Sequence, residues 1–201
     1  MGELHYANNT MDIASFRIYL RHAFRHLPWE FWLVIAVIAL VTALAMRKLK
    51  GYSAYASIAL GLTVFFGIYM LGAMVLKRIG IQIEQHPEPN LIAEYYRLFH
   101  GSAEHRAFML FNVLVFMPFG FTLSEFLSVA KHFRPKRVLG FVAISAFLIS
   151  LSIETLQWIF RVGLFEFTDM VLNTLGAFLG AVLAIVFRKL VTVSFPKNSH
   201  C

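Results

Sequence analysis

Charged residues are scarce in this chain. Only 14% of its 201 residues are Asp, Glu, Lys or Arg, whereas 59% are hydrophobic, and the 21 Phe outnumber the 18 Lys and Arg combined. A globular domain has roughly 25% charged residues and about 45–50% apolar ones. The surface of a soluble domain cannot be covered with so few charges, and the mean hydropathy of +0.68 agrees. The composition therefore predicts an integral membrane protein.

Cysteine is almost absent, since Cys201 is the single one. One thiol excludes an internal disulfide and any cysteine-based zinc or iron–sulfur site. Neither an H-E-x-x-H motif nor a glycine-rich phosphate loop occurs. The sequence thus gives no support to a metal site or to a nucleotide cofactor, and we expect neither.

The excess of basic residues has a membrane explanation. The formal net charge is +7 and the pI is near 9.8, values that in a soluble chain would suggest nucleic acid. Here the basic residues fall in short connections between apolar runs, where they orient helices and meet anionic headgroups. No domain remains that could hold a basic groove, so we expect no nucleic-acid partner.

Five apolar runs are long enough to cross a bilayer, which takes about 20 residues per helix. They cover residues 29–46, 55–76, 108–129, 138–159 and 170–187. The alternation of a β-barrel is absent. The predicted fold is all-α, a polytopic transmembrane bundle of about five spanning helices.

Residues 1–28 have a different pattern. Arg17, Arg21 and Arg25 step by four along one helical face, while apolar residues recur at three- and four-residue spacing on another. The apolar positions are Ile13, Phe16, Leu20, Phe24 and Leu27. This pattern predicts an N-terminal amphipathic helix in the headgroup plane, and a cap packed on the bundle is the alternative.

The distribution of Lys and Arg predicts the orientation. The connections on one side, residues 47–54, 127–137 and 188–201, carry ten, and those on the other side carry eight over a much longer stretch of chain. By the positive-inside rule the denser side faces the cytoplasm. This places the C-terminus in the cytoplasm and the N-terminus outside the cell.

Six polar residues lie in or beside the last three runs, all near the predicted outer surface. They are Asn112, Glu154, Gln157, Arg161, Asp169 and Asn173. Polar groups inside a membrane are costly and therefore need a reason. At about 1.5 Å per residue they share a depth of roughly 5–9 Å, which predicts a common polar layer on three helices.

Spacing predicts how these residues face. Glu154, Gln157 and Arg161 are three and four residues apart, which puts them on one face. Asp169 and Asn173 share a face of the last helix with Gly176 and Gly180, and such glycines allow close approach of another helix. In the third run Pro118 removes a backbone hydrogen bond, so a kink would open space beneath Asn112.

Two interpretations of the layer remain open. In the structural one, Glu154 pairs with Arg161, Asp169 caps its helix, and the amides join helices by hydrogen bonds. In the functional one, a carboxylate, a guanidinium and three amides form a ligand pocket that opens outward. At the other end of the third run, Glu125 is expected to pair with one of the cytoplasmic cations Lys131, Arg134, Lys136 and Arg137.

The residues from about 55 to 187 resemble the VanZ-like family, named for a teicoplanin-resistance membrane protein. The resemblance rests on the segments 89–92, 112–120, 154–157 and 173–180, together with Arg161 and Asp169. The chain departs from the family pattern after residue 92, where Ala93 and Glu94 follow. The implied organisation is an N-terminal helix (1–28), an additional span with a basic loop (29–54), a VanZ-like domain (55–190) and a cytoplasmic tail (191–201).

The resemblance implies a multi-pass protein of a bacterial plasma membrane, linked to resistance against teicoplanin and similar lipoglycopeptides. The outward pocket fits a binding role for membrane lipids, a lipoglycopeptide or a lipid-linked wall precursor. The main alternative is a membrane enzyme acting on a lipid-linked substrate, with Glu154 or Asp169 as acid or base. A small transporter is a third hypothesis, and it would require an oligomer.

Overall fold

The computed structural model of the chain describes residues 27–75, 96, 103–163 and 165–194. Five long helices make up this part, and all are long and apolar enough to cross a membrane. They are α2 (Trp29–Lys50), α3 (Ala54–Met74), α5 (Ala103–Ala130), α6 (Pro135–Ile159) and α7 (Phe167–Ser194). The predicted five-span helical bundle is confirmed. Residues 1–26 lie outside the described part, so the N-terminal amphipathic helix remains a prediction.

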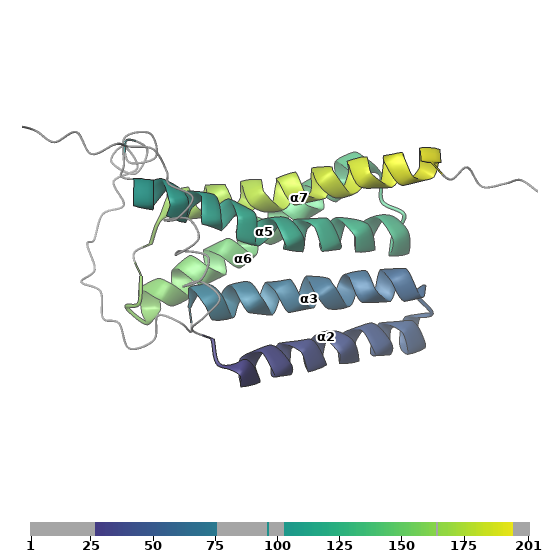
Figure 1. Cartoon of the computed structure of the whole chain (residues 1–201), viewed down its shortest axis with the longest axis horizontal. Coiled ribbons are helices and arrows are strands. Elements are labelled where there is room, and N and C mark those ends of the chain that lie inside the picture. The colour runs from purple at the N-terminus through teal and green to yellow at the C-terminus, as the bar shows by residue number, and fades with distance from the viewer. Residues whose placement is uncertain (1–26, 76–95, 97–102, 164, 195–201) are drawn as a thin grey trace, which may run out of the picture.

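Helix α5 lies at the centre of the bundle. Its most extensive contact is with α7, and it also packs against α3 and α6. Helix α6 crosses the others obliquely and packs mainly on α7, while α2 packs on the outer side of α3 (Figure 1). In the most apolar window of each helix, 56% of residues are buried in α5 but only 6% in α2. Helix α2, the additional span, therefore lies at the periphery of the bundle and packs mainly on α3.

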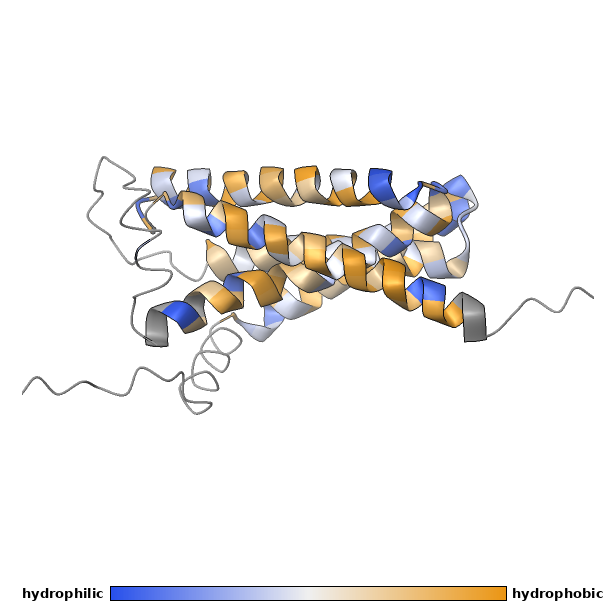
Figure 2. Ribbon diagram, turned by 90° about the horizontal axis from the view of Figure 1, so that it is seen from above, coloured by the Kyte–Doolittle hydropathy of each residue, from blue (hydrophilic) through white to orange (hydrophobic). Residues whose placement is uncertain are grey.

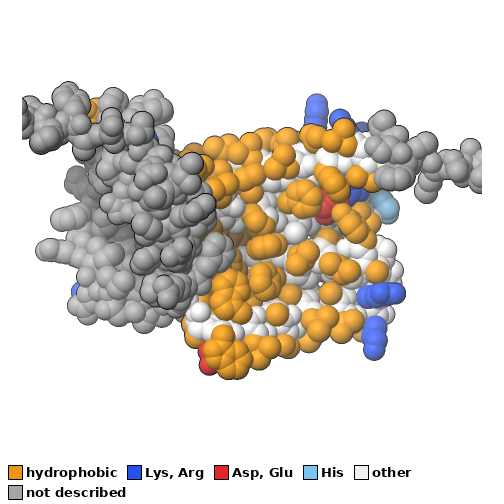
Figure 3. Space-filling view, in the orientation of Figure 1, with side chains coloured by type: hydrophobic (Ala, Val, Ile, Leu, Met, Phe, Trp, Pro, Cys, Tyr) orange, Lys and Arg blue, Asp and Glu red, His pale blue; other side chains and the backbone are white. Residues whose placement is uncertain are grey.

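The surface has the polarity of a lipid-facing protein. Apolar residues run along all five helices, and hydrophilic ones gather toward the ends (Figure 2). Hydrophobic side chains cover much of the visible face, with Lys and Arg at one end (Figure 3). Large apolar side chains such as Leu33, Val41 and Leu183 are half exposed or more. Such exposure would be unfavourable in water, whereas in a bilayer these side chains meet lipid tails.

Glycine allows α5 and α7 to pack backbone against backbone. A Cβ atom added to Gly176 would overlap the carbonyl oxygen of Val113, and one added to Gly180 would overlap that of Met117. Gly120 of α5 meets Ala177 in the same way. The close approach expected for Gly176 and Gly180 is thus confirmed, and its partner is α5. From Gly176 to Gly180 the contacted carbonyl advances from Val113 to Met117, four residues on each helix, so the two helices run parallel.

Most of the positive charge lies at one end of the bundle. Of the eleven Lys and Arg whose side chains are described, all but Arg106 and Arg161 lie where α2 and α7 end and where α5 connects to α6. We call this the basic end; its residues are Arg47, Lys48, Lys50, Lys131, Arg134, Lys136, Arg137, Arg188 and Lys189. The end where α3 and α6 finish and α5 and α7 begin is called the opposite end.

The glycine contacts generate a prediction about stability. Gly180→Ala forces a methyl group against the Met117 carbonyl, and overpacking of this kind costs about 1–3 kcal/mol. Gly140→Ala is the matched control, because a Cβ there meets nothing within 4 Å. We expect thermal unfolding in detergent to show a lower midpoint for Gly180→Ala and an unchanged or higher one for Gly140→Ala. Equal midpoints for both variants would contradict backbone packing of α5 on α7.

Candidate polar site at the opposite end

Helix α6 brings two long polar side chains into the interior near its C-terminal end. Glu154 is 1% exposed, and its Oε2 accepts a hydrogen bond from the backbone N–H of Glu166 at 2.9 Å. Gln157, three residues later, donates through Nε2 to the carbonyl oxygen of Met74 at 2.9 Å. Met74 is the last residue of α3, so this amide satisfies a carbonyl that lacks a partner within its own helix. The two side chains tie α6 to the start of α7 and to the end of α3.

A third contact joins α7 to α6. Asn173 is buried, and its Nδ2 donates to the hydroxyl of Ser150 at 2.8 Å. Ser150 lies one turn before Glu154, so Asn173 faces the part of α6 that carries the carboxylate. Hydrogen bonds between membrane helices contribute about 0.6–2 kcal/mol each. These contacts match the structural interpretation for Gln157 and for one half of the Asn173 amide, whereas Glu154 bonds to the Glu166 N–H and not to Arg161.

Two buried amide atoms are left without a partner. They are Nδ2 of Asn112, a donor on α5, and Oδ1 of Asn173, an acceptor on α7; both side chains are at most 2% exposed. The contact of Gly176 with Val113 shows that the two asparagines lie at a similar depth, because Asn112 precedes Val113 by one residue and Asn173 precedes Gly176 by three. At about 1.5 Å per residue the offset along the axes is only about 3 Å. A donor and an acceptor are thus available at one level of the bundle.

Arg161 is placed differently from the prediction. Helix α6 ends at Ile159, and Arg161 is exposed, with φ of 56° in the left-handed region. Its N–H donates to the Trp158 carbonyl, and the N–H of Val162 donates to that of Gln157, which is the Schellman pattern that usually has glycine at this position. The helical face of Glu154 therefore does not extend to Arg161, and the two form no ion pair. The left-handed backbone conformation costs a non-glycine residue about 1–2 kcal/mol. The fold therefore places Arg161 at the end of the bundle in spite of this conformational cost.

Asp169 lies in the first turn of α7 and is partly buried. A carboxylate in this position is favoured by the N–H groups and the dipole of the helix. Glu154 meets the same helix start through Glu166, so two acidic side chains lie at the beginning of α7. Over the ranges that the structure describes, no three His, Cys, Asp or Glu side chains are grouped so that they could hold a metal ion.

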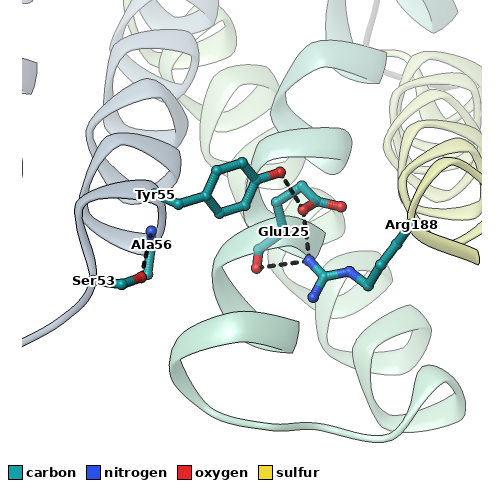
Figure 4. Close-up of polar contacts among 5 residues, drawn as sticks. All are labelled: Ser53, Tyr55, Ala56, Glu125 and Arg188. Atoms are coloured by element: carbon teal, nitrogen blue, oxygen red, sulfur yellow. Dashed lines mark hydrogen bonds and ion pairs between the residues drawn. The ribbon is translucent and has the colours of Figure 1, made fainter. Parts of the chain in front are cut away.

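A second polar cluster lies at the basic end, and its composition differs from the prediction (Figure 4). Glu125 of α5 is buried and pairs with Arg188 of α7, whose Nη2 is 2.5 Å from Oε2. The hydroxyl of Tyr55 on α3 donates to the same oxygen, also at 2.5 Å. The expected pairing with a cation of the 131–137 segment was wrong, because those residues follow the end of α5 and are exposed. Arg188 instead belongs to the parallel helix and reaches the level of Glu125.

Comparison with known proteins identifies the family of the chain. The profile of the VanZ/LLP1 family matches residues 52–188. Protein VanZ of Enterococcus faecium is 38% identical over 77 residues, a match that covers 37% of this chain and 42% of the enterococcal protein. No solved structure matches. Because the family profile spans about two thirds of the sequence, including every helix of the bundle except α2, the chain belongs to the VanZ/LLP1 family.

Proposed function

We propose that this protein binds a lipid or a lipid-linked cell-envelope ligand at the polar site of α5, α6 and α7. The observation that carries the proposal is the pair of unpartnered amide atoms, Asn112 Nδ2 and Asn173 Oδ1. A buried polar group without a hydrogen bond costs about 1–3 kcal/mol. A site built only to join helices would give both atoms a hydrogen-bond partner. Their lack of one fits a ligand that accepts a hydrogen bond from Asn112 Nδ2 and donates one to Asn173 Oδ1.

The chemistry of the site suggests the class of ligand. An amide or a hydroxyl group on the ligand would match the free donor and acceptor, and Arg161 would meet an anionic headgroup at the bundle surface. Apolar chains of the ligand would remain among the exposed hydrophobic side chains of the bundle. A lipid-linked wall precursor and an acylated glycopeptide both combine these features. The kinship with Protein VanZ supports a role in resistance to teicoplanin and related lipoglycopeptides.

We also propose that the basic end faces the cytoplasm, so that the polar site lies on the side of the outer leaflet. Cationic connections stay on the cytoplasmic side during insertion, and the two described cations elsewhere are Arg106 and Arg161. An outward polar site would meet both extracellular antibiotics and outer-leaflet lipids.

The single cysteine tests this orientation. Cys201 in the C-terminal tail is expected to resist a membrane-impermeant maleimide in intact cells and to react after permeabilisation. Cysteine introduced at Arg161 in a Cys201→Ser background is the reciprocal control, and it should react in intact cells. Labelling of Cys201 from outside would reverse the assignment.

Glu154→Gln tests the function of the polar site. The glutamine amide can still accept the hydrogen bond from Glu166, but the negative charge is gone. In a Gram-positive host, we expect the wild-type protein to raise the inhibitory concentration of teicoplanin and to leave that of vancomycin, which lacks the acyl chain, unchanged. The variant is expected to return teicoplanin susceptibility to that of the host without the protein.

Ser152→Ala is the matched control on the same helix. The Ser152 hydroxyl is exposed and bonds only to the Leu148 carbonyl of its own helix, so its loss should leave protection intact. Immunoblots of membranes establish that all variants are present at equal levels. Full protection by Glu154→Gln at equal abundance would assign Glu154 a purely structural role and would also remove the acid–base hypothesis.

A further inference from the structure

An apolar groove opens on the side of the bundle between α3 and α7. Its volume is about 460 Å³, which is within the range of ligand sites, roughly 300–1,000 Å³. Helix α5 forms the floor with Met117, Pro118 and Phe121, while Leu62 and Phe66 of α3 and Leu183 of α7 form the walls. Neither Asn112 nor Glu154 lines it, so the groove is separate from the polar site.

The groove leads toward the polar cluster at the basic end. Tyr55 precedes Leu62 by seven residues, and Glu125 follows Phe121 by four, so each continues the groove-facing side of its helix. The two side chains meet in a hydrogen bond, and Arg188 of α7 joins them. The cluster therefore draws one residue from each of the three helices that line the groove. The Arg188 side chain remains 35% exposed, so part of the guanidinium is accessible.

The end of the bundle toward which the groove leads is strongly positive. The basic end carries nine Lys and Arg, and Glu125, which is neutralised by Arg188, is the one acidic residue on the described helices there. Lys189 follows Arg188 directly and is exposed. An apolar groove that leads toward a cationic cluster at the end of the bundle complements a molecule with a hydrocarbon chain and an anionic head.

We infer that this groove is a binding site for an anionic phospholipid of the leaflet at the basic end. One acyl chain lies along α5 between Leu62, Phe66 and Leu183, and the phosphate meets Arg188 and Lys189. The site is independent of the proposed function, because it shares no residue with the polar site and the cations that it uses lie at the basic end.

Native mass spectrometry of the full chain in detergent tests the inference. Phosphatidylglycerol and phosphatidylcholine with identical acyl chains are the two probes. We expect one phosphatidylglycerol molecule to bind with an affinity at least about fivefold higher than that of phosphatidylcholine. A cation near the headgroup contributes about this factor. Equal binding of the two lipids would contradict a site that selects an anionic lipid. Occupation of the groove by a second copy of the chain would appear as a dimer and would equally overturn the proposal.

Two variants locate the lipid. Leu183→Trp fills the groove and should weaken phosphatidylglycerol binding, whereas Leu179→Trp, one turn away on α7 and outside the groove, should not. The double variant Glu125→Gln/Arg188→Gln removes the guanidinium without leaving an unpaired buried charge. It should lose the preference for phosphatidylglycerol over phosphatidylcholine. Wild-type binding by Leu183→Trp, or a retained preference in the double variant, would overturn the proposal.

Discussion

The packing of α7 on α5 is the contact on which the rest of the structure depends. Gly176, Gly180 and Gly120 bring the two backbones together without intervening side chains. In a bilayer there is no hydrophobic drive for one helix to prefer another helix over lipid, so close van der Waals contact has to supply the attraction. Because the helices run parallel, their polar residues arrive in matching order along the membrane normal.

Two polar clusters follow from this register. Near the N-terminal ends of α5 and α7, Asn112 and Asn173 lie at one level, and α6 adds Ser150, Glu154 and Gln157. Near its end, Glu125 and Arg188 lie at one level, and α3 adds Tyr55. The first cluster retains an unpartnered donor and an unpartnered acceptor, while the second is built around an ion pair and leaves only the acceptor Oε1 of Glu125 without a partner. Helix α2 contributes to neither, which agrees with the family match beginning at residue 52.

The fold could be predicted from the sequence because each helix has an apolar run of spanning length. The helix ends could not be predicted, because a helix can continue past the hydrocarbon layer. Helix α5 starts at Ala103, five residues before its predicted span, and α7 continues to Ser194, seven residues beyond its own. The similar level of Asn112 and Asn173 on α5 and α7 also followed from residue counting. The close approach at Gly176 and Gly180 was predictable because only small residues permit it.

The partners within the site could not be predicted. Periodicity gives the direction of a side chain on its own helix but not the rotation of the neighbouring helix, so Ser150 and the Met74 carbonyl were not foreseen as acceptors. Arg161 was assigned to a helical face that ends two residues earlier. Glu125 was paired with cations close in sequence, whereas the parallel course of α5 and α7 places Arg188, 63 residues away, at its level.

We propose that the asparagine layer serves a ligand at a cost in stability. Asn112→Leu tests it most directly, because leucine has the same number and branching of heavy side-chain atoms and lacks the unpartnered Nδ2. We predict that the free energy of unfolding of the purified variant increases by about 1–3 kcal/mol, which raises its thermal midpoint. Protection against teicoplanin is lost at equal abundance of the protein. A lower midpoint with intact protection would show that Asn112 supports the fold and that the layer is structural.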